Sequence, residues 1–144
     1  MQTIVLTEPG HLVFDERPVP ADPPPGHALV RVHRVGVCGT DFHAYRGRQT
    51  FFTYPRILGH ELGVEVIAVH PTPDAPSPVA VGDHCAIEPY LYCGKCIACR
   101  QGRTNCCVNM QVMGVHVDGG MRPYLTVPLH HLHPSQALTL DQLA

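Results

Sequence analysis

The feature that most constrains this chain is a run of cysteines in its second half. Five of the seven cysteines fall between positions 93 and 107: Cys93, Cys96, Cys99, Cys106 and Cys107. Gly94 and Gly102 allow tight turns, so the chain can fold back and bring four sulfur atoms to one point. Four converging thiolates are the ligands of a closed, tetrahedral structural zinc site. The spacing predicts a cysteine-rich zinc lobe over residues 90–110, with either Cys106 or Cys107 as the fourth ligand.

Two other uses of such a cysteine run agree less well with the sequence. Disulfide clusters are typical of exported proteins, but the N-terminus lacks a basic segment followed by an apolar run, and seven cysteines are an odd number. An iron–sulfur cluster favours a close fourth cysteine followed by proline, whereas Val108 follows the distant Cys107. We therefore predict reduced thiols, metal binding and a cytoplasmic location.

Charge and hydrophobicity argue against other classes of partner. The formal net charge is −2 and charged residues make up 15% of the chain, which gives no footprint for nucleic acid. No apolar run approaches the length of a membrane span. A chain of 144 residues can bury a core as one domain. We expect a single domain, residues 1–144, with no nucleic-acid and no membrane partner.

Fifteen prolines and thirteen glycines, with little helical periodicity, predict a mainly β fold with many turns and few short helices. Runs with strand character occur at residues 2–6, 11–14, 28–35, 62–69, 84–87, 111–117 and 120–127. Residues 41–45 predict one helical turn, and the proline-rich segments 18–26 and 71–78 predict an extended connection and a surface loop. Thr139 and Gln142 form a helix-capping pattern, which predicts a helix that runs beyond Ala144 and a chain that is a piece of a longer protein.

A second set of metal-binding side chains lies upstream, beside glycines at predicted strand ends. Cys38 offers a thiolate, and the neighbours His60 and Glu61 offer an imidazole and a carboxylate. Such a mixed, incomplete ligand set is typical of catalytic zinc, which keeps a position open for water or substrate. The alternative is a buried cysteine and a core histidine that bind no metal.

Three residues near Cys38 are suited to supporting roles. Asp41 can orient a metal-binding histidine, and Thr40 and His43 can pass a proton from the site to solvent. The other histidines without spacing partners are predicted to lie on the surface or to pack against strands: His11, His70, His130, His131 and His133.

Together these motifs resemble the zinc-containing medium-chain alcohol dehydrogenases. The segments Gly36-Val37-Cys38-Gly39-Thr40-Asp41, Gly59-His60-Glu61 and Gly82-Asp83 precede the cysteine lobe in the order seen in that family. The sorbitol and threonine dehydrogenase branches are the most similar, because Cys-Gly-Thr-Asp and Cys-Gly-Lys-Cys are typical there. The resemblance implies a GroES-like, partly open β-barrel with a catalytic and a structural zinc.

The resemblance also assigns roles to residues. The catalytic zinc would be bound by Cys38 and His60, joined in some states by Glu61. The neighbouring segment would supply three further roles: Asp41 holding His60, Thr40 contacting the substrate hydroxyl, and His43 continuing the proton relay. The structural zinc would be bound by four cysteines: Cys93, Cys96, Cys99 and Cys107.

The implied activity is oxidation of a secondary alcohol or polyol, a small molecule, with hydride transfer to NAD or NADP. The complete enzyme is expected to be a homo-oligomer. No Gly-x-Gly-x-x-Gly pattern occurs, so the Rossmann cofactor domain is absent from this chain and the chain alone is expected to be inactive. A third ligand of the catalytic zinc would fall beyond Ala144. Val64 stands where the family usually has a glycine, with Gly63 just before it.

Two other functions compete with the enzyme. One is a stand-alone zinc-binding GroES-like interaction module without catalysis; a scaffold of that kind has no need of Cys38, Thr40 or His60. The other is a thiol–disulfide protein acting through Cys93 and Cys96. It is disfavoured because this pair is not predicted to open a helix after a strand.

Overall fold

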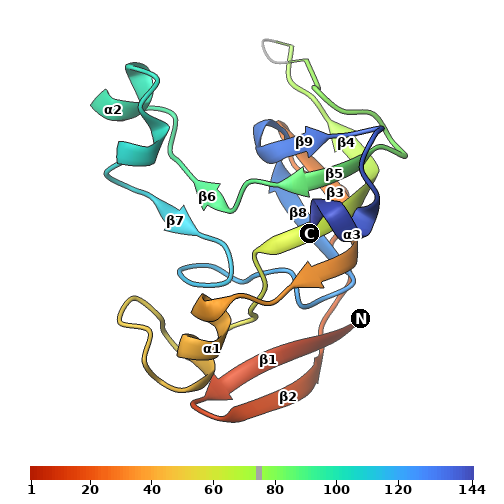
Figure 1. Ribbon diagram of the computed structural model, residues 1–144. Helices are drawn as coiled ribbons and strands as arrows, with labels where there is room; N and C mark the ends of the chain where they lie inside the picture. Colours follow the sequence, from red (N-terminus) through yellow and green to blue (C-terminus); the bar gives the residue numbers. More distant parts are fainter. Residues whose placement is uncertain (74–75) are drawn as a thin grey trace.

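The computed structural model of the chain describes residues 1–73 and 76–144. Its centre is a five-stranded antiparallel sheet in the order β8-β3-β4-β5-β9 (Figure 1). These strands are β3 (His27–Gly36), β4 (Glu61–His70), β5 (His84–Ile87), β8 (Tyr124–Pro128) and β9 (Leu132–Pro134). The prediction of a mainly β fold is confirmed, and the strands predicted around residues 28–35, 62–69 and 84–87 lie in this sheet.

A hairpin and several short elements complete the chain. The hairpin joins β1 (Gln2–Glu8) to β2 (His11–Glu16), and a smaller pair joins β6 (Tyr90–Leu91) to β7 (Gln111–Val112). The helices are α1 (Gly39–Tyr45), α2 (Ile97–Arg100) and α3 (Leu140–Leu143), with 3-10 turns η1 (Thr104–Cys106) and η2 (Leu129–His131). Among the described residues, none of these helices has the length and apolar character needed to cross a bilayer.

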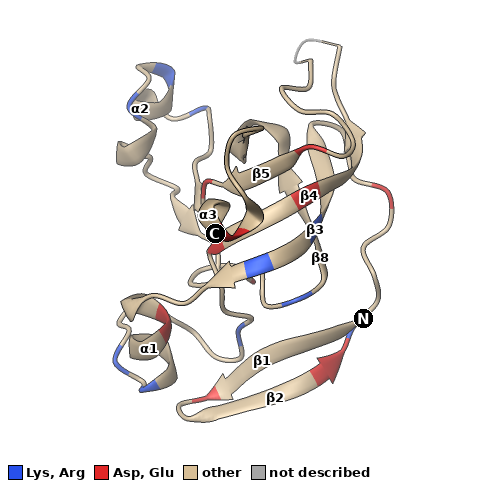
Figure 2. Ribbon diagram, turned by 45° about the vertical axis from the view of Figure 1, so that its right-hand side comes forward, with Lys and Arg blue, Asp and Glu red and all other residues tan. Residues whose placement is uncertain are grey.

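The core follows from the alternation of side chains along the strands. Inward-facing residues of β3, β4 and β8 are at most 1% exposed: Ala28, Val30, Leu62, Val64, Val66, Leu125 and Val127. A second cluster of Leu6, Ala44, Phe52, Leu58 and Val115 lies beneath α1. It connects the hairpin to the helix that carries the upstream candidate ligands. Charged residues of both signs are spread over strands and loops (Figure 2).

Two predicted strands are partly wrong. Only Gln111–Val112 of the segment 111–117 is a strand, because Gly114 adopts a left-handed conformation (φ 73°) and the chain turns back so that Gly114 N–H donates to Val117 O. The strand predicted from residue 120 begins at Tyr124. The preceding residues instead form hydrogen bonds with the loop before β4.

The histidine prediction is correct in part. His11 and His130 are exposed, but His131 is 1% exposed and belongs to η2, just before the unpredicted strand β9. Its ring packs on Tyr92, with 4.9 Å between ring centroids. The predicted surface loop 71–78 includes residues 74 and 75, which lie outside the described residues.

Gly63 has a structural reason to be glycine. A Cβ atom at this position of β4 would overlap the carbonyl oxygen of Leu140, because α3 lies directly on the strand there. The next residue, Val64, points the other way into the core and is fully buried. The family pattern usually has its glycine at position 64, and this chain has it at position 63. The packing of α3 on β4 explains the glycine at 63.

Candidate metal centres

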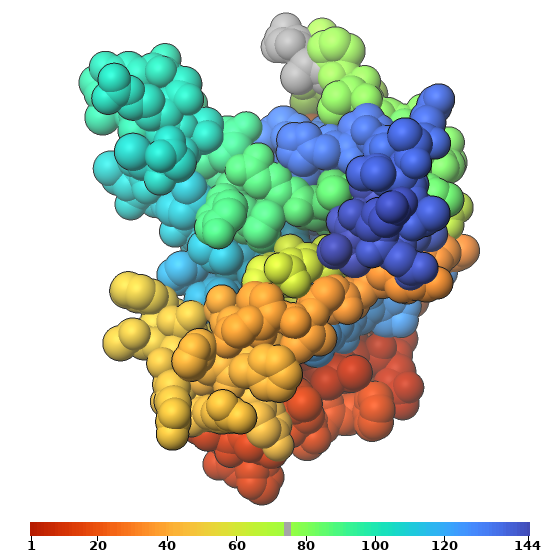
Figure 3. All heavy atoms as spheres, in the orientation of Figure 1, coloured from red at the N-terminus to blue at the C-terminus, as the bar shows by residue number. Residues whose placement is uncertain are grey.

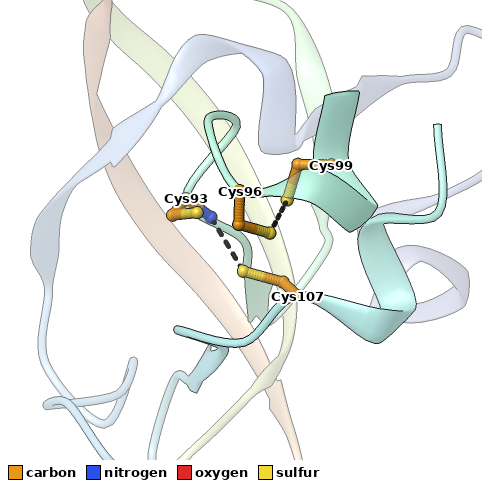
Figure 4. Close-up of side chains that lie close together, drawn as sticks. All are labelled: Cys93, Cys96, Cys99 and Cys107. Atoms are coloured by element: carbon orange, nitrogen blue, oxygen red, sulfur yellow. Dashed lines mark hydrogen bonds between the residues drawn. The ribbon is translucent and has the colours of Figure 1, made fainter. Parts of the chain in front are cut away.

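The structure gathers four cysteine sulfurs into one group. The Sγ atoms of Cys93, Cys96, Cys99 and Cys107 all lie within 4.8 Å of one another, and they point to a common centre (Figure 4). Cys96 Sγ and Cys99 Sγ are 3.4 Å apart, and Cys93 N–H donates to Cys107 Sγ at 3.3 Å. All seven cysteines are free thiols. The geometry is that of a sulfur cage with room for one tetrahedral ion.

Short-range structure explains why the sulfurs converge. The pairing of β6 with β7 brings the two ends of the lobe together. Gly94 and Gly102 both have positive φ values, 70° and 72°, which only glycine adopts without strain. Cys96 stands at the N-cap of α2, so the pair Cys93–Cys96 does precede a short helix. This corrects one argument against a thiol–disulfide role, but both sulfurs are part of the four-sulfur group.

Electrostatics within the lobe favour a bound cation. Backbone N–H groups of Lys95 and Cys96 point at Cys93 and lower the pKa of its thiol to about 6. Burial and the neighbouring cysteines raise the pKa of Cys99 to about 12. Four thiols this close together cannot all ionise without a compensating positive charge. A bound divalent ion would supply that charge.

Of the two adjacent cysteines, the structure brings Cys107 into the group. Cys107 is 8% exposed, and its sulfur also accepts from Asn109 N–H at 3.4 Å. Cys106 ends η1, is exposed and lies outside the four-sulfur group. The spacing alone left this choice open, and the geometry agrees with the residue that the family resemblance favoured.

A second group joins Cys38, Asp41 and His60, whose ligand atoms also lie within 4.8 Å of one another. Cys38 is the N-cap of α1, and Asp41 completes a capping box by accepting from Cys38 N–H at 3.0 Å. His60 lies between Gly59, with φ 92°, and the start of β4. Helix start and strand start therefore meet at this point, which fixes the thiol and the imidazole relative to each other.

The orientation of the His60 ring fits a metal ligand. Its Nε2 atom faces Cys38 Sγ at 3.1 Å, while Nδ1 faces Asp41 Oδ1 at 3.7 Å. Both Nδ1 and Oδ1 are buried, and neither has a hydrogen-bond partner among the residues that the structure describes. A carboxylate beside Nδ1 favours the tautomer with the proton on that nitrogen, which would leave Nε2 to bind an ion together with the thiolate. Zinc, which accepts sulfur and nitrogen ligands, fits this donor set.

The other predicted residues lie near this group but outside it. Glu61 is exposed, and its carboxylate folds over Gly36 of β3, where an added Cβ would come within 2.7 Å of Oε2. Thr40 donates its backbone N–H to Cys38 Sγ at 3.3 Å, and His43 is exposed further along α1. Zinc binding by Glu61 and proton transfer by Thr40 and His43 stay predictions.

The sequence did not predict the contact between residues 119–121 and the loop that precedes His60. The strands predicted at 111–117 and 120–127 leave residues 118 and 119 as the link between them. In the structure, residues 119–121 form hydrogen bonds with residues 57–59, just before His60. Two consecutive glycines after an aspartate were a signal of close backbone approach.

Comparisons with known proteins give both a structural match and a family match. A crystal structure of a short chain alcohol dehydrogenase (rspB) from Escherichia coli CFT073, complexed with NADH, superposes with a TM-score of 0.85 at 33% identity, covering 99% of this chain and 41% of that one. Residues 24–137 match the family described as the alcohol dehydrogenase GroES-like domain. The chain belongs to this family, which confirms the predicted GroES-like fold.

Curated relatives are named as dehydrogenases. L-galactonate-5-dehydrogenase of Escherichia coli K12 is 40% identical over 138 residues, covering 96% of this chain and 39% of the relative. L-threonine 3-dehydrogenase of Pyrococcus horikoshii is 36% identical over 138 residues, covering 92% and 38%. The chain thus spans about two fifths of the length of these relatives.

Proposed function

We propose that the chain is the zinc-binding catalytic domain of a dehydrogenase that oxidises a secondary alcohol or polyol with NAD or NADP. In this proposal residues 1–144 form one domain with a zinc lobe at 90–110, and the dinucleotide is bound by another part of the whole protein. The similarity to an alcohol dehydrogenase complexed with NADH and to relatives named L-galactonate-5-dehydrogenase and L-threonine 3-dehydrogenase supports this class.

The observation that carries the proposal is the group of Cys38, Asp41 and His60. A protein that used zinc only to hold its fold would need the four-sulfur lobe and nothing more. The second group instead combines a thiol, an imidazole and a carboxylate that faces the remote nitrogen of the imidazole. An incomplete ligand set leaves a coordination position for a substrate, which a closed structural site does not.

Each residue of this group has a distinct task. Cys38 Sγ and His60 Nε2 would hold a zinc ion, with Glu61 as a further ligand in some states, and Asp41 Oδ1 would hold the proton on His60 Nδ1. A zinc ion bound there lowers the pKa of a hydroxyl group that approaches it. Thr40, in the first turn of α1, accepts the proton of the substrate hydroxyl, and the exposed His43 passes it to solvent.

The lobe has the structural role. We assign its ion to Cys93, Cys96, Cys99 and Cys107. For the whole protein we propose a cytoplasmic homo-oligomer that acts on a small-molecule alcohol or polyol.

Zinc stoichiometry during chelator titration tests the proposal. We expect one zinc ion for each of the two groups, with the ion at Cys38 and His60 lost first because fewer protein ligands hold it. His60→Ala should remove that ion alone, and His70→Ala, on the far end of β4, should remove neither. A wild-type chain that retains zinc in the lobe only, with no change in His60→Ala, would instead support the interaction module.

A further inference from the structure

One carboxylate lies where three separate segments meet beside the second group. Asp118 Oδ1 accepts from the backbone N–H of Ile57 at 3.2 Å and from Arg56 Nη1 at 3.4 Å. Its other oxygen, Oδ2, accepts from Arg17 Nη1 at 3.4 Å. The Asp118 side chain is 30% exposed and that of Arg56 is 18% exposed, so these contacts are partly shielded from solvent. The Arg17 side chain is 38% exposed, so its pair with Asp118 is the more solvated of the two.

The residues after Asp118 form a backbone ladder with the residues before His60. Gly119 N–H donates to Ile57 O at 2.7 Å, Gly120 N–H to Gly59 O at 2.8 Å and Met121 N–H to Leu58 O at 3.0 Å. A Cβ atom on Gly119 would overlap the carbonyl oxygens of both Leu58 and Gly59. The two segments are therefore in direct backbone contact, and movement of one displaces the other.

The N-terminal hairpin also forms hydrogen bonds with both of these segments. Leu6 and Arg56 exchange backbone hydrogen bonds of 2.9 and 3.0 Å, and Ile4 N–H donates to Met121 O at 3.0 Å. Arg17 follows the second strand of this hairpin and also pairs with Asp15. Asp118 thus connects the hairpin, the segment before His60 and its own glycine loop through one side chain.

The position of His60 in the chain makes it sensitive to this connection. The pairing of β4 with β3 begins at Glu61, which faces Gly36, so the sheet fixes only the C-terminal side of His60. Its N-terminal side is fixed by the ladder that Asp118 begins. Asp41 Oδ1 faces the ring at Nδ1 from 3.7 Å, whereas the backbone that carries the ring is fixed by the ladder.

We propose that Asp118 is a positioning residue for His60, fixing the backbone before it so that Nε2 meets Cys38 Sγ in the geometry a metal ion requires. This rests on the proposed function of the Cys38–His60 group. Outer residues that orient a metal ligand change metal affinity by about 10- to 100-fold when replaced. Asp118 acts one step further out, through the backbone, so we expect the lower part of that range.

The test compares Asp118→Ala and Asp118→Asn with Asp83→Ala in the zinc-loaded chain. Asp83 is a matched control, because its carboxylate also accepts a loop N–H, that of Ala80 at 2.8 Å. It lies beside Val66, about 20 Å along β4 from His60. Chelator competition gives the zinc affinity of each group separately, and the ¹⁵N chemical shift of His60 Nε2 reports whether that nitrogen binds the ion.

Asp118→Ala should weaken zinc binding at Cys38 and His60 about 10-fold and reduce the coordinated fraction of Nε2, with the four-sulfur lobe unchanged. Asp118→Asn keeps an acceptor for Ile57 N–H and should recover part of the affinity. Asp83→Ala should change neither group. Equal weakening of both groups, or none at either, in Asp118→Ala would overturn the proposal.

Failure of the proposed function gives a different result. In that case the wild-type chain binds no zinc at Cys38 and His60, and amide hydrogen exchange decides the role of Asp118. Faster exchange confined to Ile57 and residues 119–121 in Asp118→Ala supports the positioning role, and unchanged exchange there overturns it.

Discussion

The two candidate metal centres are built in opposite ways. The lobe takes its ligands from one continuous segment, 93–107, and neither α2 nor η1 contains a buried residue. The lobe stands away from the barrel, and a recess separates it from the α1 region (Figure 3). Cys38, Asp41 and His60 come instead from a helix start and a strand start, next to two buried clusters.

Because of this difference, we expect the ion to order the ligands in the lobe and the fold to order them at the second centre. In the lobe, few side chains are buried, so we expect a bound ion to supply the free energy that orders the segment. At the second centre the barrel is already ordered by its apolar core, so the fold fixes the ligands and an ion adds little to stability. Metal removal should therefore unfold the lobe and leave the barrel intact.

Removing one sulfur from the lobe should have the largest effect, and that effect should be confined to the lobe. Structural zinc contributes about 10–16 kcal/mol in small zinc domains, and Cys107→Ser should lose most of the corresponding stabilisation of the lobe. We expect the loss of the lobe ion and rapid proteolysis within residues 90–110, while amide exchange in β3 and β4 stays slow.

Cys106→Ser is the matched control, since Cys106 is exposed and lies outside the sulfur group. It should keep both the ion and the protease resistance. Proteolysis of the Cys106 variant with a stable Cys107 variant would reverse the ligand assignment, and unfolding of the whole barrel would contradict the independence of the two regions.

A glycine replacement should affect the second centre and spare the lobe. Gly119→Ala places a methyl group against the carbonyl oxygens of Leu58 and Gly59, and forced repacking of this kind costs about 1–3 kcal/mol. The barrel should lose that stability in denaturant unfolding, and zinc at His60 should bind more weakly.

Gly39→Ala is the control for Gly119→Ala. Gly39 follows Cys38, yet an added Cβ there meets nothing within 4 Å and its φ is not positive. The stability of this variant should stay within about 1 kcal/mol of the parent. A Gly119 variant as stable as the Gly39 variant would show that the backbone contact at residues 58 and 59 does not constrain the barrel.

The last prediction concerns the effect of acid on His131, at the junction between the lobe and the barrel. The His131 ring is 1% exposed and packs on Tyr92, which leads into the lobe, and on His130. Burial, helped by the charges of His130 and His133, lowers the pKa of His131 to about 4, although a hydrogen bond with the Glu88 backbone opposes the shift. The unfolded chain accepts this proton near pH 6.5, so the free energy of unfolding should fall by about 1–3 kcal/mol between pH 6.5 and 4.

Denaturant unfolding at a series of pH values measures this dependence. His131→Asn should flatten it in that window, whereas replacement of the exposed His11 by asparagine should not. Because parent and variant share the other acid-sensitive groups, their difference isolates His131. Parallel pH curves for parent and His131→Asn would count against a neutral, buried imidazole.

Much of the barrel was predictable because its strands are locally consistent. Alternation along residues 28–35 and 62–69 predicts β3 and β4 within a residue at each end, since one face of each strand is buried. The segment 113–123 was not predictable in this way. Its apolar residues suggest a strand, but its conformation is set by contact with Gly59 and with the loop 57–59, which are far away in sequence.

The two candidate metal centres differ in the same way: one depends on local sequence and the other on contacts between distant segments. The lobe is visible in the sequence because its ligands are local, and only the choice between Cys106 and Cys107 needed the fold. The grouping of Cys38 with His60 depends on the antiparallel pairing of β3 with β4, which brings Gly36 opposite Glu61. Asp118 was missed because its partners, Arg17, Arg56 and Ile57, are scattered along the chain.

The pairing of β6 with β7 has a consequence for how such a domain can vary. Tyr90 faces Val112 and Leu91 faces Gln111, so the polypeptide leaves the barrel and returns to it at the same place. Residues 92–110 form an insertion between β6 and β7, and its length does not alter the order of the other strands. A two-residue reverse turn joining Leu91 to Gln111 would close the same hairpin. The sulfur cage is thus an exchangeable insert, which can be shortened, enlarged or replaced while the barrel and its Cys38–His60 pair keep their places.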